Sequence, residues 1–145
     1  MASVRLAFAL LLFGLGTTAA WGQTSSPDGP KSVPDTVLRR VTTAFIDGNA
    51  QLLLSPAADR VEVSLFGTRT FYSSAQAFYV LREFFDTHTP SSFALSDATG
   101  AGRSCFVRGR LDHAHGERTL QVYVRLVQRS DVWQLHEVRI DADVE

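Results

Sequence analysis

The second half of the chain contains segments in which apolar and polar residues alternate. They cover residues 92–97, 104–112, 119–129 and 132–141. Alternation with a period of two is typical of a strand that buries one face and exposes the other. Strands joined by short connections pair antiparallel, so the sequence predicts a four-stranded antiparallel meander. The connections are expected at residues 100–102, 113–118 and 130–131.

The last of these segments changes phase in its middle. Trp133 and Leu135 share one face, whereas Val138 and Ile140 share the other. A slip of one residue near positions 136–137 predicts a β-bulge, which bends the strand and its sheet.

Two helices are expected before the first strand. Pro34 and Asp35 suit the first turn of a helix, because proline needs no N–H partner there and an acid favours its positive end. Apolar residues then recur at helical spacing and form one stripe: Val37, Leu38, Val41, Ala44 and Phe45. The opposite side is expected to carry Arg39, Arg40, Thr42 and Thr43. Gly48 ends this helix, and a short helix follows over residues 50–54, before Pro56.

A strand and a third helix precede the meander. Residues 61–65 alternate and are predicted as a strand, with a turn at residues 67–68. Ser73 suits a helix N-cap, and Gln76 completes a capping box. The helix that follows is apolar nearly all round, so we expect it to be buried; the region closes at Pro90. Its apolar residues are Ala75, Ala77, Phe78, Tyr79, Val80, Leu81, Phe84 and Phe85.

These elements together predict one α+β domain over residues 32–145. The bulge should curve the antiparallel sheet. We expect two to three helices from the N-terminal half to close this curved sheet into a cone.

Residues 1–22 have the layout of a secretory signal peptide, with a basic residue, an apolar run and then small residues. A membrane-spanning helix needs about 20 apolar residues, so the run over residues 6–16 is too short for a permanent anchor. We expect cleavage after Ala20 or after Gly22 and a flexible leader over residues 23–31. The mature protein is predicted to be exported, periplasmic or secreted, and not to span a membrane.

Composition excludes several functions. The net charge is −1, whereas a nucleic-acid-binding protein usually has a strong basic excess. Cys105 is the single cysteine, which excludes an intramolecular disulfide and a multi-cysteine zinc site. It shares its phase with Val107 and Leu111, so we expect an inert, buried thiol. The chain lacks a phosphate loop, a Rossmann fingerprint and a Gly-x-Ser-x-Gly elbow, and we predict no cofactor.

One connection carries residues that can bind a metal. Asp112, His113, His115 and Glu117 lie close together, and imidazole and carboxylate are ligands for zinc or copper. A metal site usually adds a ligand from elsewhere in the fold, and the sequence shows no obvious one. We therefore interpret the segment as a polar hairpin tip and predict no metal.

A second candidate site lies on the polar face of the meander. Arg108, Arg110, Tyr123 and Arg125 fall in the phase opposite to the apolar residues of their strands. Such a face suits an acidic ligand or a protein partner. The alternative is the ordinary solvated face of an antiparallel sheet, with acidic neighbours that neutralise it.

The order of elements resembles the uncharacterised exported bacterial family DUF4783, within the NTF2-like (cystatin-like) superfamily. The resemblance extends over about residues 40–141 and ends in Trp133-x-Leu135-His136-x-Val138-Arg139-Ile140. The other matching pieces are Gly48-Asn49-Ala50, Val61-Glu62-Val63, Tyr72-Ser73, Ala75-Gln76-Ala77, Phe84-Phe85, Ser92-Phe93, Gly109 and Val122-Tyr123.

This resemblance implies an NTF2-like cone in a small exported protein, found mainly in Bacteroidota. Such cones often have a pocket at their open end, and its candidate residues here are Tyr72, Gln76, His136 and Arg139. The alternative is that Gln76 only caps its helix and that His136 is a satisfied, partly buried side chain.

The family has no assigned activity, so the resemblance gives no mechanism. We expect an exported, non-catalytic accessory protein that binds a protein partner or a small ligand through its sheet or pocket. NTF2-like domains often dimerise through the sheet, which makes a homodimer one form of this interaction. The alternative is an isomerase or hydrolase that uses the cone cavity.

Overall fold

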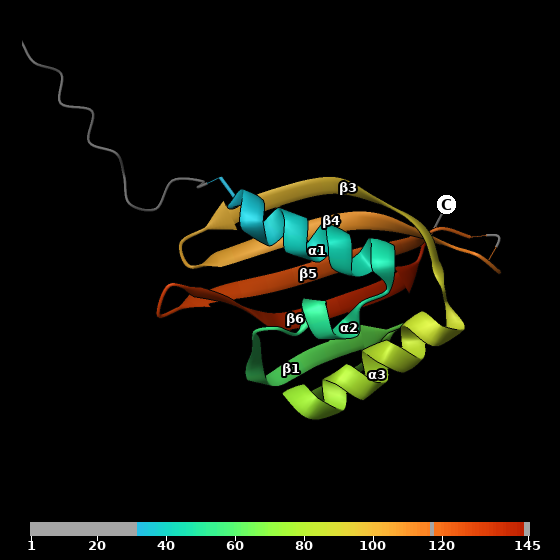
Figure 1. Cartoon of the computed structure of the whole chain (residues 1–145), viewed down its shortest axis with the longest axis horizontal. Helices are drawn as coiled ribbons and strands as arrows, with labels where there is room; N and C mark the ends of the chain where they lie inside the picture. The colour runs from blue at the N-terminus through green and yellow to red at the C-terminus, as the bar shows by residue number, and fades with distance from the viewer. Residues whose placement is uncertain (1–31, 117, 144–145) are drawn as a thin grey trace, which may run out of the picture.

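The computed structural model describes residues 32–116 and 118–143 (Figure 1). Its elements are α1 (Asp35–Asp47), α2 (Ala50–Leu53), β1 (Ala57–Leu65), β2 (Thr68–Ser73), α3 (Ser74–Thr87), β3 (Pro90–Ala101), β4 (Ser104–His113), β5 (Leu120–Arg129) and β6 (Val132–Ala142). The predicted signal peptide and leader lie outside the described residues. In the described part of the chain, no helix combines the length and the apolar character that a membrane crossing requires.

All the strands join one curved, unclosed sheet in the order β2-β1-β6-β5-β4-β3. The strands β3 to β6 pair antiparallel in sequence order, which confirms the predicted meander. β1 lies parallel to β6 and antiparallel to β2. The predicted α+β class, with a curved and mostly antiparallel sheet, is therefore confirmed.

The predicted bulge lies at His136. Arg125 pairs with Glu137, but the next residue of β5, Leu126, pairs with Leu135. One extra residue of β6 is thus left between two successive pairs, as the change of phase in the sequence required.

The edge strands differ from expectation. The sequence predicted only a turn at residues 67–68 and missed β2, because residues 68–73 are mostly exposed and show no apolar stripe. The strand exists because it pairs without interruption along β1. At the other edge, β3 extends beyond the predicted 92–97 and includes Gly100, which was expected in a turn.

The helix α3 begins as predicted but is not buried all round. The Ser73 hydroxyl accepts a hydrogen bond from the Gln76 N–H at 3.2 Å, and the Gln76 side chain accepts one from the Ser73 N–H at 3.1 Å. Only one face is buried, whereas Tyr79 is 65% exposed. The prediction of all-round burial was wrong because α3 covers only β1 and β2 at the edge of the sheet. The buried residues of α3 are Ala77, Leu81, Phe84 and Phe85.

The helix α1 buries its predicted stripe, but Arg40 departs from the expected solvent side. Its guanidinium donates hydrogen bonds to the carbonyls of Leu52 (3.2 Å), Leu53 (2.8 Å), Pro56 (2.7 Å) and Trp133 (2.7 Å). The first two carbonyls lie at the end of α2, where few N–H donors remain; that of Leu52 also accepts a hydrogen bond from the Ser55 N–H at 3.4 Å. Arg40 therefore ties α1 to α2 and to the start of β6.

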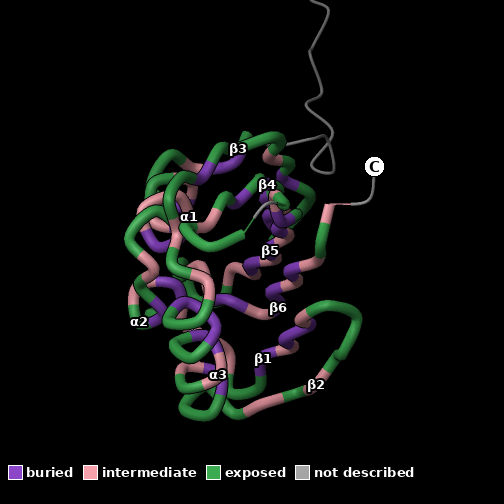
Figure 2. The backbone as a smooth tube through the Cα atoms, turned by 90° about the vertical axis from the view of Figure 1, so that its right-hand side faces the viewer, coloured by how far each residue is buried: buried purple, intermediate pink, exposed green. Residues whose placement is uncertain are grey.

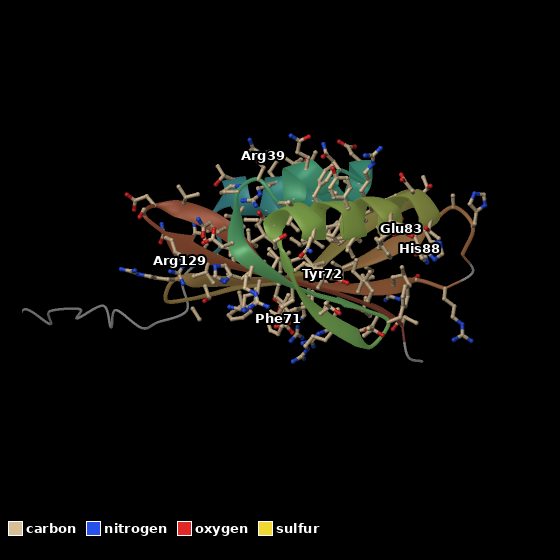
Figure 3. All side chains as sticks on the ribbon, turned by 90° about the horizontal axis from the view of Figure 1, so that it is seen from below. Arg39, Phe71, Tyr72, Glu83, His88 and Arg129 are labelled. Carbon is tan, nitrogen blue, oxygen red and sulfur yellow. The ribbon has the colours of Figure 1, made fainter. Side chains whose placement is uncertain are left out.

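The helices lie on one face of the sheet, and the core fills the space between (Figures 1 and 2). There the ring of Phe45 stacks on Phe93 at 5.1 Å and meets Phe85 edge-on at 5.7 Å. Gly109 makes room for this cluster, because a Cβ atom on it would lie 2.2 Å from the Phe93 ring. No described helix covers the opposite face of the sheet (Figure 3).

Candidate functional site: the open face of the sheet

The uncovered face, here called the open face, is centred on Arg108, Tyr123, Arg125, Glu137 and Arg139. Strand alternation places these side chains there, because their neighbours in β4, β5 and β6 are buried in the core. Arg108 pairs with Tyr123, and Tyr123 pairs with Arg139, so the three form one row across the sheet. Arg125 and Glu137 pair in the adjacent row.

The bulge adds a residue to this face. Leu135 and Val138 are both fully buried in the core. The two residues between them, His136 and Glu137, both line hollows on the open face. A regular strand would send one of the two inward, so the bulge is what places a histidine beside the carboxylate.

Tyr123 lies between two guanidinium groups. The guanidinium carbon of Arg108 is 5.9 Å from the ring centroid, and that of Arg139 is 5.3 Å away. Both distances allow a cation–π interaction. Burial and the nearby Glu137 carboxylate raise the pKa of the Tyr123 hydroxyl, which therefore stays protonated and can donate a hydrogen bond.

Glu137 holds two of the three arginines of the centre, Arg125 and Arg139, in place. It is only 8% exposed. Its two carboxylate oxygens accept hydrogen bonds from Arg125 at 3.3 Å and from Arg139 at 3.1 Å. Arg108 makes no ion pair with a carboxylate of the described residues. Its charge is therefore available to a ligand.

Two hollows share Arg108 and Tyr123. The larger is about 440 Å³, and the carboxylates of Glu137 and Asp141 line it as well. The smaller is about 360 Å³, and Asp97 lies in its lining. Both hollows thus mix positive and negative groups, which suits a partner surface that carries both signs.

A third hollow of about 330 Å³ lies beside the bulge. Its lining is Arg60, Glu62, Phe71, Arg125 and His136. The guanidinium carbon of Arg60 is 5.8 Å from the centroid of the Phe71 ring. That ring is 55% exposed. The sequence did not indicate Phe71, because β2 was not recognised as a strand. The one available signal was that Phe71 lies between Thr70 and Tyr72, two residue types that favour strands.

The imidazole of His136, which lines this third hollow, is partly buried and lies near positive charges. Its Nε2 atom is buried and has no hydrogen-bond partner among the described residues. Burial, followed by the charges of Arg125 and Arg129, lowers the pKa of the ring. A neutral imidazole is therefore favoured, and the two arginines make this end of the open face electropositive.

The four predicted pocket residues do not lie together. Tyr72 pairs with the buried Val61 and packs on the core side of the sheet, whereas Phe71 points to the open face (Figure 3). Gln76 completes the capping box at the start of α3. His136 and Arg139 line different hollows on the open face. The structure thus separates the predicted pocket into two pairs on opposite sides of the sheet.

The four predicted sheet-face residues do share the open face. Arg108, Tyr123 and Arg125 form part of its centre. Arg110 lies two residues further along β4, and Asp143 binds its guanidinium at 2.8 Å. Strand pairing therefore brings these residues together on one face, as the alternation in the sequence predicted.

The histidine-rich connection offers no metal centre within the described residues, where no three His, Cys, Asp or Glu side chains gather to hold an ion. The Asp112 carboxylate accepts hydrogen bonds from Thr119 (2.6 Å) and Ser92 (3.0 Å), which lower its pKa. The His113 ring packs against His88 at 5.1 Å. Glu117, the last candidate ligand, lies outside the described residues.

The comparisons with known proteins agree with this architecture. The profile of DUF4783, a domain of unknown function, matches residues 38–141. A DUF4783 protein from Bacteroides ovatus is 27% identical, with a TM-score of 0.69 over 78% of this chain and 97% of its own. A DUF4783 protein from Bacteroides uniformis is also 27% identical, with a TM-score of 0.69 over 75% of this chain and 99% of its own.

More distant structures share the fold alone. An NTF2-like protein of unknown function from Silicibacter pomeroyi is 12% identical, with a TM-score of 0.55 over 74% of this chain and 91% of its own. None of the curated proteins matches the chain.

Proposed function

The chain belongs to the DUF4783 family, and we propose that it is an exported, non-catalytic protein that binds a partner through the open face of its sheet. The observation that carries this proposal is the row in which Tyr123 lies between Arg108 and Arg139 on an uncovered surface. Arginine and aromatic residues are enriched where proteins bind one another. Export is proposed from the signal-like sequence of residues 1–22.

A non-catalytic role fits the chemistry of the open face. Glu137 is the buried carboxylate, but both its oxygens are engaged by arginines, so it is not free to accept a proton from a substrate. On the other side of the sheet, Phe45, Phe85 and Phe93 pack ring against ring where a cone cavity would lie. Among the described residues, neither Glu137 nor this aromatic cluster therefore provides a base that is free to act on a substrate.

The occupant we propose is a protein surface that carries both carboxylates and basic side chains. Glu62 is paired with Arg69 at 2.7 Å, and Glu137 with two further arginines. Arg60 and Arg108, by contrast, lie over aromatic rings and form no ion pair with the described carboxylates. These two guanidiniums are left to bind carboxylates of the partner, whereas Asp97 and Asp141, which also form no ion pair with the described residues, are left to bind its basic side chains.

Site-specific photo-crosslinking in the native host tests this proposal. A photoreactive amino acid at Gln121, which lines the hollow of about 440 Å³, should give a discrete crosslinked product. The same amino acid at Arg39, on the helix side, serves as the control (Figure 3). A product from position 39 and none from position 121 would contradict the proposed surface. A product of twice the chain mass would identify a second copy as the partner.

Export is tested separately. Fractionation of the host cells and N-terminal sequencing should find the mature chain in the envelope or the medium, beginning at residue 21 or 23. A cytoplasmic protein that retains residue 1 would contradict export but not the binding surface.

A further inference from the structure

We infer that the third hollow, between Phe71 and His136, is a binding site for a small monocarboxylic acid with an apolar body. This inference goes beyond the proposed function, because it adds a small-molecule ligand to the open face and does not require the protein partner. The hollow has a volume of about 330 Å³, which is within the range of small-molecule sites.

The charges around this hollow favour a carboxylate. Two guanidiniums, those of Arg60 and Arg125, line it. Its acidic member, Glu62, is only 13% exposed in its side chain and is held by Arg69 at 2.7 Å. The hollow therefore keeps an uncompensated positive charge at Arg60, and Arg129 adds to the positive potential at His136. The other two hollows contain Asp97 or Asp141, which would repel the same ligand.

The apolar part of the ligand is indicated by Phe71. More than half of this ring is exposed, although it lies within the sheet and not at a loop tip. A ligand that packs on the ring would remove apolar surface from water. Because Arg60 already lies over the ring, its guanidinium is placed to bind a carboxylate on a ligand that covers Phe71. An acid with a flat apolar body satisfies both groups at once.

Three strands and the bulge build this site jointly. Arg60 comes from β1, Phe71 from the edge strand β2, and Arg125 from β5. The extra residue His136 forms the remaining wall. Without the bulge, the imidazole would not face this hollow, so the site depends on the irregularity of β6.

Phenylacetate is the probe, and phenylacetamide and acetate are its matched controls. Each is titrated into ¹⁵N-labelled mature protein while amide shifts are recorded. Phenylacetate should shift the amides of Phe71 and His136 with a dissociation constant in the millimolar range, as expected for a fragment of about ten heavy atoms. The neutral amide and acetate should each bind at least about fivefold more weakly, because one lacks the charge and the other the apolar body.

Variants identify the site. Arg60→Gln and Phe71→Ser should each weaken phenylacetate binding at least about fivefold. Both side chains are exposed, so the fold should persist, and an unchanged amide spectrum away from the hollow checks this. Arg108→Gln removes the same charge from the neighbouring hollows and should leave binding unchanged.

Equal binding of phenylacetamide and phenylacetate would overturn the inference. So would loss of binding in Arg108→Gln with retention in Arg60→Gln, which would move the ligand to the Tyr123 hollows. If the probes fail to bind but the Gln121 photo-crosslink forms, the ligand assignment is refuted while the proposed function stands. If the probes bind as expected and no crosslink forms at position 121, the proposed protein partner is refuted and the small-acid site stands.

Discussion

Replacing Arg40 with alanine should be strongly destabilising, because this side chain donates hydrogen bonds to four backbone carbonyls at once. Three of its hydrogen bonds are partly buried, and the one to Pro56 is exposed. Burial lowers the pKa of the guanidinium, but an arginine stays charged in a protein. A bond to a charged group contributes about 1.5–3 kcal/mol, and a carbonyl left buried without a donor costs about 1–3 kcal/mol.

These contributions do not add fully, because one side chain makes all four bonds and water can replace the exposed one. The carbonyls of Leu52 and Pro56 also keep backbone donors, the N–H groups of Ser55 and Leu135. We therefore expect Arg40→Ala to lower the free energy of unfolding by about 3–5 kcal/mol, out of the roughly 5–15 kcal/mol available to a domain. For a domain of this size, that corresponds to a fall in Tm of about 10 °C or more.

Urea unfolding of the mature protein, followed by circular dichroism, measures this effect. Arg39→Ala is the matched control, since Arg39 is the exposed neighbour on the same helix, and it should change stability by less than about 0.5 kcal/mol. Arg40→Lys should fall between the two, because an ammonium group cannot reach carbonyls in so many directions. A loss for Arg40→Ala within about 1 kcal/mol of the control would refute the reasoning.

Three further predictions concern the core, the cysteine and pH. Gly109→Ala should lower the free energy of unfolding by about 1–3 kcal/mol in the same assay, because the new Cβ would overlap the Phe93 ring; an unchanged midpoint would contradict this packing. Burial raises the pKa of the Cys105 thiol to about 11, so it should resist a thiol reagent at pH 8 until the protein unfolds; rapid labelling of folded protein would contradict it. The pKa of His136 is lowered in the folded state, so the unfolded chain takes up its proton first as the pH falls below about 6.5. Stability should therefore decrease between pH 7.5 and 5.5 in the wild type, and less so in His136→Gln; equal slopes would argue against a neutral, buried imidazole.

The sequence predicts this fold well wherever a strand or helix has one buried face. In β4 and β5, alternation alone identifies the inward residues. In β6, the change of phase between Leu135 and Val138 locates the bulge at His136. Such patterns are readable because burial imposes a period on a single element.

Interactions that join distant segments could not be predicted in this way. Arg40 lies on the polar side of its helix, yet its long side chain reaches carbonyls of α2 and β6 that only the tertiary structure brings near. β2 is held by its pairing with β1 and has no buried stripe of its own. Without that strand, the role of Phe71 could not be inferred.

For the candidate site too, the sequence predicted the direction of side chains within a strand but not the relative positions of distant strands. The phase of β4 and β5 grouped Arg108, Tyr123 and Arg125 correctly on one face, because each strand fixes the direction of its own side chains. The proposed grouping of Tyr72 with His136 needed the positions of β2 and β6 relative to each other. The structure places these two residues on opposite faces, which local patterns do not determine.

The parallel pairing of β1 with β6 has a consequence for how the chain acquires its structure. The first and last strands of the domain are neighbours, so β1 pairs along only one of its edges until the final strand arrives. Contacts between such distant segments slow folding, because a long loop must close before they form. A chain still emerging from the ribosome cannot complete this sheet. Any partly synthesised form that stops before β6 exposes two further strand edges, those of β1 and β5. Synthesis of the last strand is therefore the event that permits the domain to fold.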